Sequence, residues 1–206
     1  MTSHPRDFDS ELAHTIANLD KVCRHFHLPL QSGCNRILGM MNRGYTTEEY
    51  LDKINLIRSL CPDAVITTDI IVGFPDETEN DFNQTLSFLE TCEFDAAYTF
   101  LYSPKTGTPA AEMKDQIPED IKKNRLQRLM DLQNPISLKK NQAYIGKILP
   151  VMVEGISKND PNTMSGRTDG NKIVIFPNKE GLVPGDIVDV HITEAKTWNL
   201  LGHLVN

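Results

Sequence analysis

The sequence contains no long hydrophobic run. No stretch approaches the roughly 20 consecutive apolar residues that a membrane-spanning helix needs. The amino-terminal segment MTSHPRDFDSE lacks both the basic and the apolar region of a secretory signal peptide. With 39% hydrophobic and 24% charged residues among 206, the composition is that of an ordinary globular protein. We therefore expect no membrane association and a cytoplasmic location.

Closely spaced cysteines are also missing. The four cysteines are Cys23, Cys34, Cys61 and Cys92. They are separated by 11, 27 and 31 positions, so no CxxC or CxxxCxxC motif is present to bind zinc or an iron–sulfur centre. We expect free thiols that are buried or half-buried. His25 and His27 would share one face of a strand, but no third metal ligand is close in sequence, and we interpret both as packed histidines.

Basic residues are fewer than acidic ones. With 21 Lys and Arg against 28 Asp and Glu, the formal net charge is -7, which argues against a protein whose whole surface attracts nucleic acid. A local basic patch is compatible with this balance, because most of the acid lies early in the chain. Before Gln142 there are 15 basic and 21 acidic residues, and after it 6 basic and 7 acidic residues.

The first 111 residues alternate between apolar runs and helical patterns. The runs HFHLPLQSG, AVITTDIIVGFP and AAYTFLYSP predict three strands, of which the second is closed by glycine and proline. Two helices are predicted between them, opened by Thr46 with Glu49 and by Thr78 with Asp81. The residues expected to face inward are Leu51, Ile54, Ile57, Leu60, Phe82, Leu86 and Leu89.

This order of elements predicts an α/β fold. Strands separated by helices imply right-handed crossovers and a parallel sheet that helices cover. In such folds ligands bind at the carboxyl ends of the strands. The loops at those ends are QSGCN, GFPDET and SPKTGTP, so we expect them to be neighbours in space although they are distant in sequence.

The remaining sequence predicts a long helix and then a small barrel. Residues 116–142 have a helical pattern, with Pro118 in the first turn and apolar contacts from Ile121, Leu126, Leu129 and Leu132. Pro135 should kink or end that helix and mark a hinge. Its basic residues, Lys122, Lys123, Arg125 and Arg128, are interpreted as its solvated face. From Tyr144 on, short strands and Gly-containing turns predict an antiparallel barrel of about 60 residues.

The first and third loops and the middle strand carry candidate ligand groups. Gln31 and Ser32 offer an amide and a hydroxyl, and Gly33 lets the backbone approach a ligand, although the same residues are common in ordinary turns. Asp69 lies inside an apolar strand, where a carboxylate needs either a functional role or an Arg or Lys partner. Ser103 could contact a phosphate or carboxylate, although its loop lacks the phosphate-binding motif GxxxxGK[ST].

The second loop admits two interpretations. Gly73, Phe74 and Pro75 would form a rigid corner against a flat ring, with the carboxylates of Asp76 and Glu77 available to a ligand. Alternatively, the two acids favour the start of the following helix through its dipole.

The tail holds candidates for contacts to nucleic acid. Small barrels often bind nucleic acid, whereas scattered lysines often only solvate a surface, and both interpretations stay open here. The candidate phosphate contacts, with one amide for more specific hydrogen bonding, are Lys147, Lys158, Arg167, Asn171, Lys172 and Lys196.

Several long motifs resemble those of one protein family. TSHPRDFD, HLPLQSGCNRILGMMNRGYTTEEYL, TTDIIVGFPDETENDF, YTFLYSPKTGTPAAEM and SGRTDGNKIVIF are similar to the bacterial radical S-adenosylmethionine tRNA methylthiotransferases over essentially all 206 residues. The resemblance implies three domains in the whole protein. These are an N-terminal domain with one 4Fe-4S cluster, a central radical domain with a second cluster on CxxxCxxC, and an OB-like TRAM barrel that binds tRNA.

The sequence departs from that family in what it omits. It begins midway through the central domain and lacks both sets of cluster-binding cysteines, so the resemblance implies a C-terminal part of such an enzyme. Residues 1–142 would be the second half of a partial (β/α) barrel, and residues 143–206 the TRAM domain. Two smaller departures are Asp76, where relatives commonly have glycine, and Pro135.

The resemblance also implies roles and partners. Gln31 and Ser32 would face S-adenosylmethionine, and GFPDET would form a second wall near its adenine. The implied partners are a tRNA anticodon stem-loop and the missing N-terminal part of the protein. An exposed sheet edge should also invite association with a second copy.

Three functional hypotheses follow. The first is part of an enzyme that installs a 2-methylthio group on N6-isopentenyladenosine beside the anticodon, with the chain itself inactive because it lacks cluster ligands. The second is a tRNA-binding module without chemistry. The third is a cluster-independent enzyme with Cys34 as nucleophile and His27 as its base.

Overall fold

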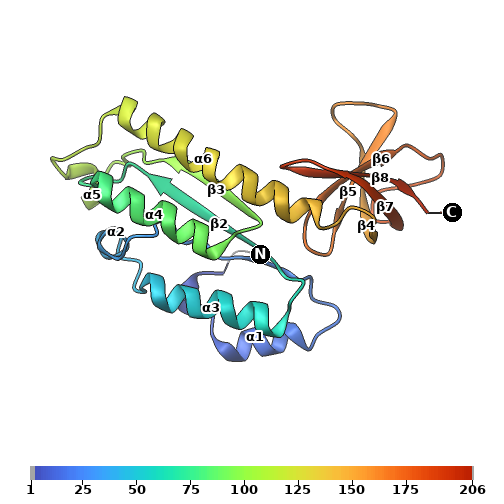
Figure 1. Cartoon of the computed structure of the whole chain (residues 1–206), viewed down its shortest axis with the longest axis horizontal. Helices are drawn as coiled ribbons and strands as arrows, with labels where there is room; N and C mark the ends of the chain where they lie inside the picture. Colours follow the sequence, from blue (N-terminus) through green and yellow to red (C-terminus); the bar gives the residue numbers. More distant parts are fainter. Residues whose placement is uncertain (1–2, 206) are drawn as a thin grey trace. The chain divides into compact units, whose positions relative to one another are not determined.

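The computed structural model describes residues 3–205, which form two compact units (Figure 1). Within the described residues, the first unit comprises 3–20 and 26–134, and the second comprises 21–25 and 135–205. The boundary between them falls inside the helix α6 (Glu119–Gln142). Within the described residues, no helix is long and apolar enough to cross a membrane.

The first unit is built on a three-stranded sheet in the order β1 (His25–His27), β2 (Val65–Val72) and β3 (Ala96–Leu101). β2 and β3 pair in parallel, and Gln31 forms a parallel bridge with Ile70, which confirms the predicted parallel sheet. β1 is shorter than predicted. Pro29 has no backbone donor and Gln31 has a φ of 75°, so the extended run is interrupted before the bridge.

Helices α3 (Thr47–Leu60) and α4 (Glu79–Cys92) follow the prediction. Each begins with the expected capping box, in which the N-cap hydroxyl and the acidic side chain three residues later exchange hydrogen bonds with backbone N–H groups. Of the apolar positions predicted to face inward, Ile54, Ile57, Phe82 and Leu89 are fully buried, and Leu51, Leu60 and Leu86 pack against the core at partial burial. The shorter helices of this unit are η1 (Pro5–Asp7), α1 (Ser10–Ala17), α2 (Asn35–Met40) and α5 (Pro109–Glu112).

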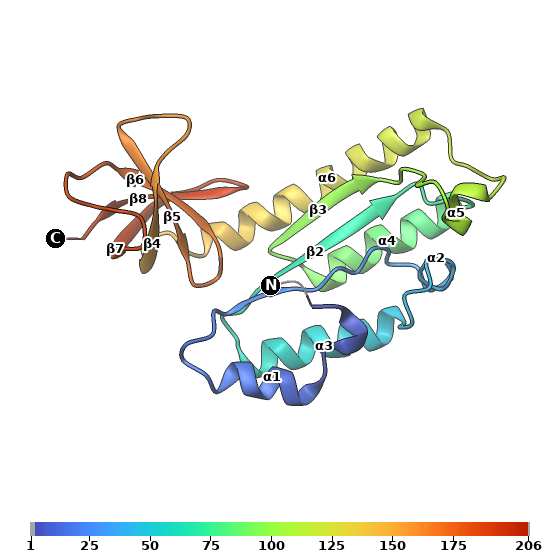
Figure 2. The same cartoon turned by 180° about the vertical axis from the view of Figure 1, so that it is seen from behind.

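Among residues 3–205, no helix covers one face of the sheet, which differs from the expectation that helices cover the sheet. Tyr98 and Phe100 on β3 are 52% and 50% exposed. Both β2 and β3 are seen unobstructed in Figure 2, with α4 and α6 on their far side. A half-exposed aromatic pair on a sheet is an apolar surface that lacks its packing partner.

Helix α6 continues through Pro135, so of the two predicted effects, a kink or an end, the proline does not end the helix. The boundary between the two compact units falls between Asn134 and Pro135, where a hinge was predicted. Pro135 is exposed, whereas a stripe at four-residue spacing is buried on the helix: Leu129, Gln133, Ser137 and Asn141. Packing of this stripe on both sides of the proline explains why the loss of one backbone donor does not end the helix. Ile121, expected to face inward, is 40% exposed.

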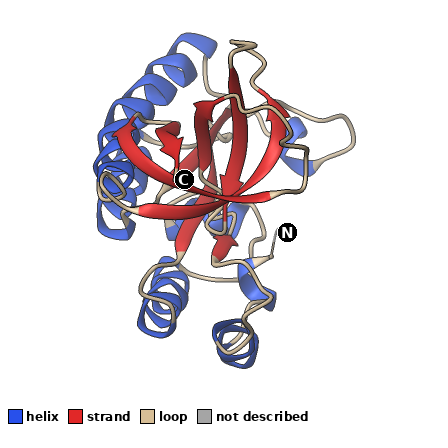
Figure 3. Ribbon diagram, turned by 90° about the vertical axis from the view of Figure 1, so that its right-hand side faces the viewer, coloured by secondary structure: helices blue, strands red, loops and turns tan. Residues whose placement is uncertain are grey.

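The second unit is a closed barrel (Figure 3) with the strand order β4-β5-β6-β8-β7. The strands are β4 (Ile148–Ile156), β5 (Thr163–Thr168), β6 (Ile173–Pro177), β7 (Ile187–Ala195) and β8 (Asn199–Leu204). The small barrel is therefore confirmed, with one difference: β6 and β8 pair in parallel, while the other pairs are antiparallel. Its core is formed mainly by alternating valine, isoleucine and leucine side chains.

Candidate functional site

The carboxyl ends of the three parallel strands bring the predicted loops to one edge of the sheet. The N–H of Gln31 donates to the carbonyl of Asp69 at 2.8 Å, and the carbonyl of Gln31 accepts from Ile71 at 2.9 Å. On the other side of β2, the N–H of Tyr102 donates to Val72 at 2.9 Å. QSGCN, GFPDET and SPKTGTP therefore leave adjacent strands at the same edge.

The uncovered face of the sheet presents alternating polar and apolar rows. Asp69 lies opposite Tyr98 in the β2–β3 register, and Ile71 lies opposite Phe100. The partner of Asp69 is His27, with Nε2 of the histidine 3.4 Å from Oδ1, and not the Arg or Lys that was one of the two alternatives. The other ring nitrogen of His27 lies 2.9 Å from the Thr67 hydroxyl, and the ring packs edge-on to Tyr98 at 5.7 Å.

A cavity of about 380 Å³ lies at the end of this face. Its walls include Ile71, Phe100, Tyr102, Ser103 and Lys105, so most of the lining is apolar with a few polar groups. The Tyr102 hydroxyl is buried and has no hydrogen-bond partner among residues 3–205. An apolar cavity with a few polar groups is the usual environment for a flat ring with polar edges. Sequence reasoning identified Ser103 here but missed Tyr102.

In the QSG turn, only Gln31 has an uncommitted side chain. Its carboxamide makes no hydrogen bond within the described chain and is half-buried. Ser32 is fully buried, with its hydroxyl 3.3 Å from that of Thr85 on α4 and accepting from Cys34 N. A Cβ on Gly33 would lie 2.7 Å from the Cα of Thr85, so this glycine is required for packing on α4.

The GFPDET corner is rigid, and both of its carboxylates have hydrogen-bond partners. Gly73 has a φ of 75°, and its N–H donates to the Glu77 carboxylate at 2.8 Å. Phe74 is buried edge-on against Tyr102 at 5.2 Å, and Pro75 is buried beside it. The carboxylate of Asp76 accepts from Arg36 at 2.7 Å.

Two cationic side chains of α6, Lys122 and Arg125, donate hydrogen bonds to this corner and to the neighbouring Tyr102. Arg125 and Lys122 are 5% and 6% exposed, so their assignment to the solvated face is wrong. Arg125 Nη1 donates to the carboxylate of Glu77 at 2.8 Å and to its carbonyl at 2.9 Å. Lys122 Nζ donates to the carbonyl of Tyr102 at 3.0 Å. Burial raises the pKa of the Glu77 carboxyl, although Gly73 N–H and Arg125 favour its charged form.

Cys34 is not placed as a nucleophile. Its thiol is buried and donates to Asp81 Oδ1 at 3.1 Å, and burial raises its pKa. His27 is bound to Thr67 and Asp69, not to Cys34. Arg36, which pairs with Asp81, holds the pKa of that carboxyl far below its ordinary range.

The four cysteines differ in exposure. Cys34, Cys61 and Cys92 are buried, as expected, whereas Cys23 is exposed. Among the described residues, no three His, Cys, Asp or Glu side chains come together in a group that would hold a metal ion. The donor set of an iron–sulfur cluster is therefore not found in this part of the protein.

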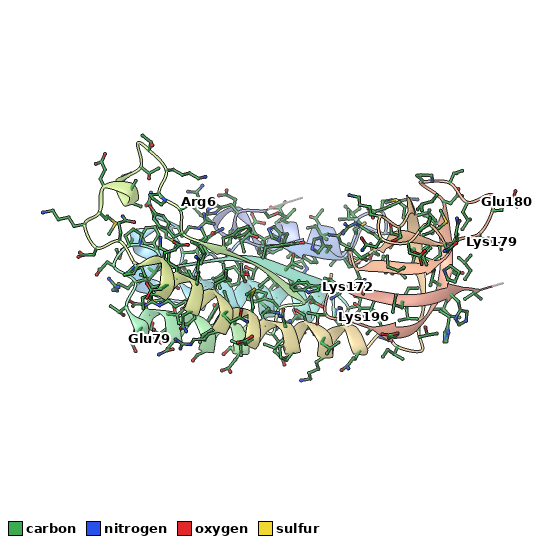
Figure 4. The ribbon with its side chains drawn as sticks, turned by 90° about the horizontal axis from the view of Figure 1, so that it is seen from above. Arg6, Glu79, Lys172, Lys179, Glu180 and Lys196 are labelled. Carbon is green, nitrogen blue, oxygen red and sulfur yellow. The ribbon has the colours of Figure 1, made fainter. Side chains whose placement is uncertain are left out.

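The strand directions of the barrel show at which of its two ends each predicted RNA-contacting residue lies. The ladders make β4, β6 and β8 point one way and β5 and β7 the other. One end of the barrel, here called the basic end, therefore carries Lys147, Arg167, Asn171, Lys172 and Lys196. Lys158 follows β4 and lies at the opposite end. In Figure 4, Lys172 and Lys196 lie together, away from Lys179 and Glu180.

The charges at the basic end are not all available to a ligand. Arg167 pairs with Glu154 at 2.8 Å and donates to the side chain of Asn171 at 2.9 Å. Lys196 lies 3.7 Å from Glu194.

Two aromatic residues at the same end were missed from the sequence. Tyr144 has the ammonium groups of Lys147 and Lys172 at 5.2 and 5.9 Å from its ring centre, and Trp198 is 60% exposed. Tyr144 and Trp198 lie outside any periodic pattern, so nothing in the sequence indicated that they would be at the basic end.

Comparisons with known proteins match a different family to each end of the chain. Residues 1–89 match the Radical SAM superfamily and residues 142–205 match the TRAM domain. Over its full length, the chain is 54% identical to the tRNA-2-methylthio-N(6)-dimethylallyladenosine synthases of Moorella thermoacetica and Thermoanaerobacter pseudethanolicus. It is 52% identical to that of Geobacillus kaustophilus. It covers 46%, 43% and 38% of these relatives.

A solved structure has the same fold. Coproporphyrinogen III oxidase (HemN) from Escherichia coli, described as a radical SAM enzyme, superposes with a TM-score of 0.57. The match covers 82% of this chain and 45% of that one, at 14% sequence identity. The chain thus corresponds to less than half of the curated relatives it matches.

Proposed function

We propose that the chain is the C-terminal part of a radical SAM tRNA methylthiotransferase that carries a TRAM domain. The substrate would be N6-isopentenyladenosine beside the anticodon, modified at carbon 2 of the adenine. The observation that carries this proposal is the common edge at which three parallel strands end, beside a largely apolar cavity.

In this proposal the sheet edge binds S-adenosylmethionine, which supplies a 5'-deoxyadenosyl group when bound in a complete enzyme. The apolar wall of Ile71 and Phe100 suits an adenine ring, and the unpartnered Tyr102 hydroxyl and Ser103 suit polar edges. Gln31 contributes its carboxamide from the neighbouring strand.

The remaining proposed residues shape the pocket more than they contact the cofactor. Gly73, Phe74 and Pro75 form the rigid corner, and Asp69 orients His27 on the open face. The side chain of Ser32 and the backbone of Gly33 pack against α4, so the contribution of these two residues is the shape of the turn.

The chain alone is proposed to be inactive. Its cysteines are far apart, and the described residues do not fit an iron–sulfur cluster, of which two are expected in the full-length family. Purified chain incubated with S-adenosylmethionine and a strong reductant should release no 5'-deoxyadenosine. Formation of that product in proportion to protein concentration would overturn this part of the proposal.

The barrel is proposed to bind the tRNA anticodon stem-loop through its basic end. Lys147, Lys172 and Lys196 would contact phosphates there, while Arg167 and Asn171 hold each other in place. Lys158, at the other end, would add only a peripheral contact. Titration of the full chain with an anticodon stem-loop tests this, and binding should weaken as salt rises.

A second candidate function is RNA binding without chemistry, and it is favoured by the missing cluster ligands. A chain that binds the stem-loop but shows no affinity for S-adenosylmethionine would support this candidate over the first.

The uncovered sheet face is proposed to pack against the remainder of the protein. The relatives are more than twice as long, since the chain covers at most 46% of them. In the isolated chain, Tyr98 and Phe100 would instead bring two copies together.

A further inference from the structure

The basic end of the barrel exposes the chain's single tryptophan. Trp198 is 60% exposed, although tryptophan is usually well buried in globular proteins. It stands in the turn between β7 and β8, beside Lys196. An indole held in solvent is a common feature of surfaces that stack on a flat ligand.

The turn that carries Trp198 is fixed rather than loose. The N–H of Lys196 donates to the carbonyl of Asn199 at 2.8 Å, which closes the turn. From α6, the Asn141 amide donates to the carbonyls of Lys196 and Thr197 at 2.8 and 3.0 Å. Because Asn141 is 3% exposed, this anchor is protected from water. The indole is therefore presented from a preorganised position, which lowers the entropic cost of binding.

Cationic groups adjoin the tryptophan. Ile173 and Asn199 are paired in the parallel β6–β8 ladder, so Lys172 and Trp198, which directly precede them, lie at the same end of adjacent strands. The ammonium groups of Lys172 and Lys147 approach the ring of Tyr144 at 5.9 and 5.2 Å. Of the 6 basic residues after Gln142, four lie at this end of the barrel, namely Lys147, Arg167, Lys172 and Lys196.

We infer that this surface binds an unpaired nucleotide of RNA, whose base stacks on Trp198 while Lys172 and Lys147 contact the adjoining phosphates. The inference rests on the proposed RNA-binding function and adds that the ligand is single-stranded at this point. Bases in a continuous A-form helix are stacked on their neighbours, whereas loop bases are free to stack on aromatic side chains. Stacking also tolerates any base, so the expected preference is for an unpaired nucleotide rather than for one sequence.

The test uses the intrinsic fluorescence of the full chain, because Trp198 is the only tryptophan. The probes are an anticodon stem-loop and a perfectly paired RNA duplex of the same length. Stacking predicts that the stem-loop quenches the emission and binds more tightly than the duplex. Trp198→Ala should weaken stem-loop binding about tenfold or more, measured by fluorescence anisotropy of labelled RNA, whereas Trp198→Phe should retain most of it.

Matched charge variants complete the test. Lys172→Ala should weaken binding and reduce its salt dependence, whereas Lys179→Ala, which follows β6 at the opposite end of the barrel, should change neither. If wild-type chain binds neither RNA, the proposed RNA-binding function itself fails. If it binds RNA equally well in both forms, with unchanged emission and no effect of Trp198→Ala, only the inference fails.

Discussion

Replacing Arg125 by methionine tests whether the buried ion pair with Glu77 holds the corner after β2. The side chains of Arg125 and Glu77 are 6% and 2% exposed, so removal of the cation leaves a carboxylate without its main partner in a dry site. Methionine keeps an apolar stem near the ring of Phe82, which lies 5.7 Å from the guanidinium carbon. The loss should therefore arise from charge and hydrogen bonding rather than from a cavity.

The magnitude follows from the proton that Glu77 takes up when its partner is lost. The ordinary pKa of a glutamate carboxyl is 4.5. Protonating Glu77 at pH 7 therefore costs at most about 3.4 kcal/mol, at roughly 1.36 kcal/mol per pH unit above that pKa. At pH 5 the same cost is about 0.7 kcal/mol. Loss of the hydrogen bond to the Glu77 carbonyl adds about 1 kcal/mol at either pH. We expect a destabilisation of roughly 2–4 kcal/mol at pH 7 and roughly 1–2 kcal/mol at pH 5.

The sign of the pH dependence is fixed by the direction of the pKa change. In Arg125→Met, the folded-state pKa of Glu77 lies above its unfolded-state value even further than in the wild type. The folded variant then binds more protons than the unfolded variant. Relative to wild type, the variant is therefore most stable below the unfolded-state pKa of Glu77, and its stability declines as pH rises through the folded-state pKa of Glu77. Raising the pH should accordingly widen the gap between variant and wild type.

The assay is urea unfolding at both pH values, with two probes because two compact units are present. Far-ultraviolet circular dichroism follows mainly the helices of the first unit, and Trp198 emission follows the second. Lys123→Met, an exposed neighbour on α6, is the control and should have little effect. The double variant Arg125→Met/Glu77→Gln should recover part of the loss, because no unpaired charge is then buried. A loss in Arg125→Met equal to that in Lys123→Met, or one independent of pH, would refute the reasoning.

Three further predictions concern single positions. Asp76 has a φ of 61°, so Asp76→Val should lower the unfolding free energy by about 2 kcal/mol, whereas Asp76→Gly should change it by less than about 1 kcal/mol in thermal unfolding; equal losses would contradict the backbone argument. Arg36 lowers the pKa of Asp81, so its stabilisation is present above the unfolded pKa and lost as pH falls through the folded pKa. Asp81→Asn should be less stable than wild type at neutral pH but approach it in strong acid, and a constant difference across an acid titration would count against this. Phe100→Glu should abolish any concentration-dependent association seen by light scattering, and undiminished association would place the contact elsewhere than on the Tyr98 and Phe100 face.

Features set by neighbouring residues could be predicted from the sequence. The capping boxes at Thr46 and Thr78 depend on a partner three residues away, and both helices begin where expected. The shared edge of the three loops followed from the parallel order alone. Strand and turn patterns predicted the small barrel, whereas its RNA-binding role and the implied cofactor came only from the resemblance to the family motifs.

Features set by distant partners could not be predicted. Arg125 is buried because Glu77, 48 residues earlier, supplies its counter-charge, and helical periodicity assigns a charged residue to the solvent side. Pro135 is tolerated because tertiary contacts hold α6 on both sides of it. The hydroxyl of Ser32 faces Thr85 on α4 rather than a ligand, because α4 packs against the QSG turn. Thr85 is distant in sequence, so this contact could not be predicted either.

We propose that the edge where the three strands end is a binding site for S-adenosylmethionine. Backbone amide spectra of the isotope-labelled chain, recorded as millimolar S-adenosylmethionine is added, test it most directly. We predict saturable shifts for Gln31, Gly73, Tyr102 and Ser103, and none for the barrel strands. Absence of any shift at this edge in a folded chain, or shifts confined to the barrel, would contradict the claim.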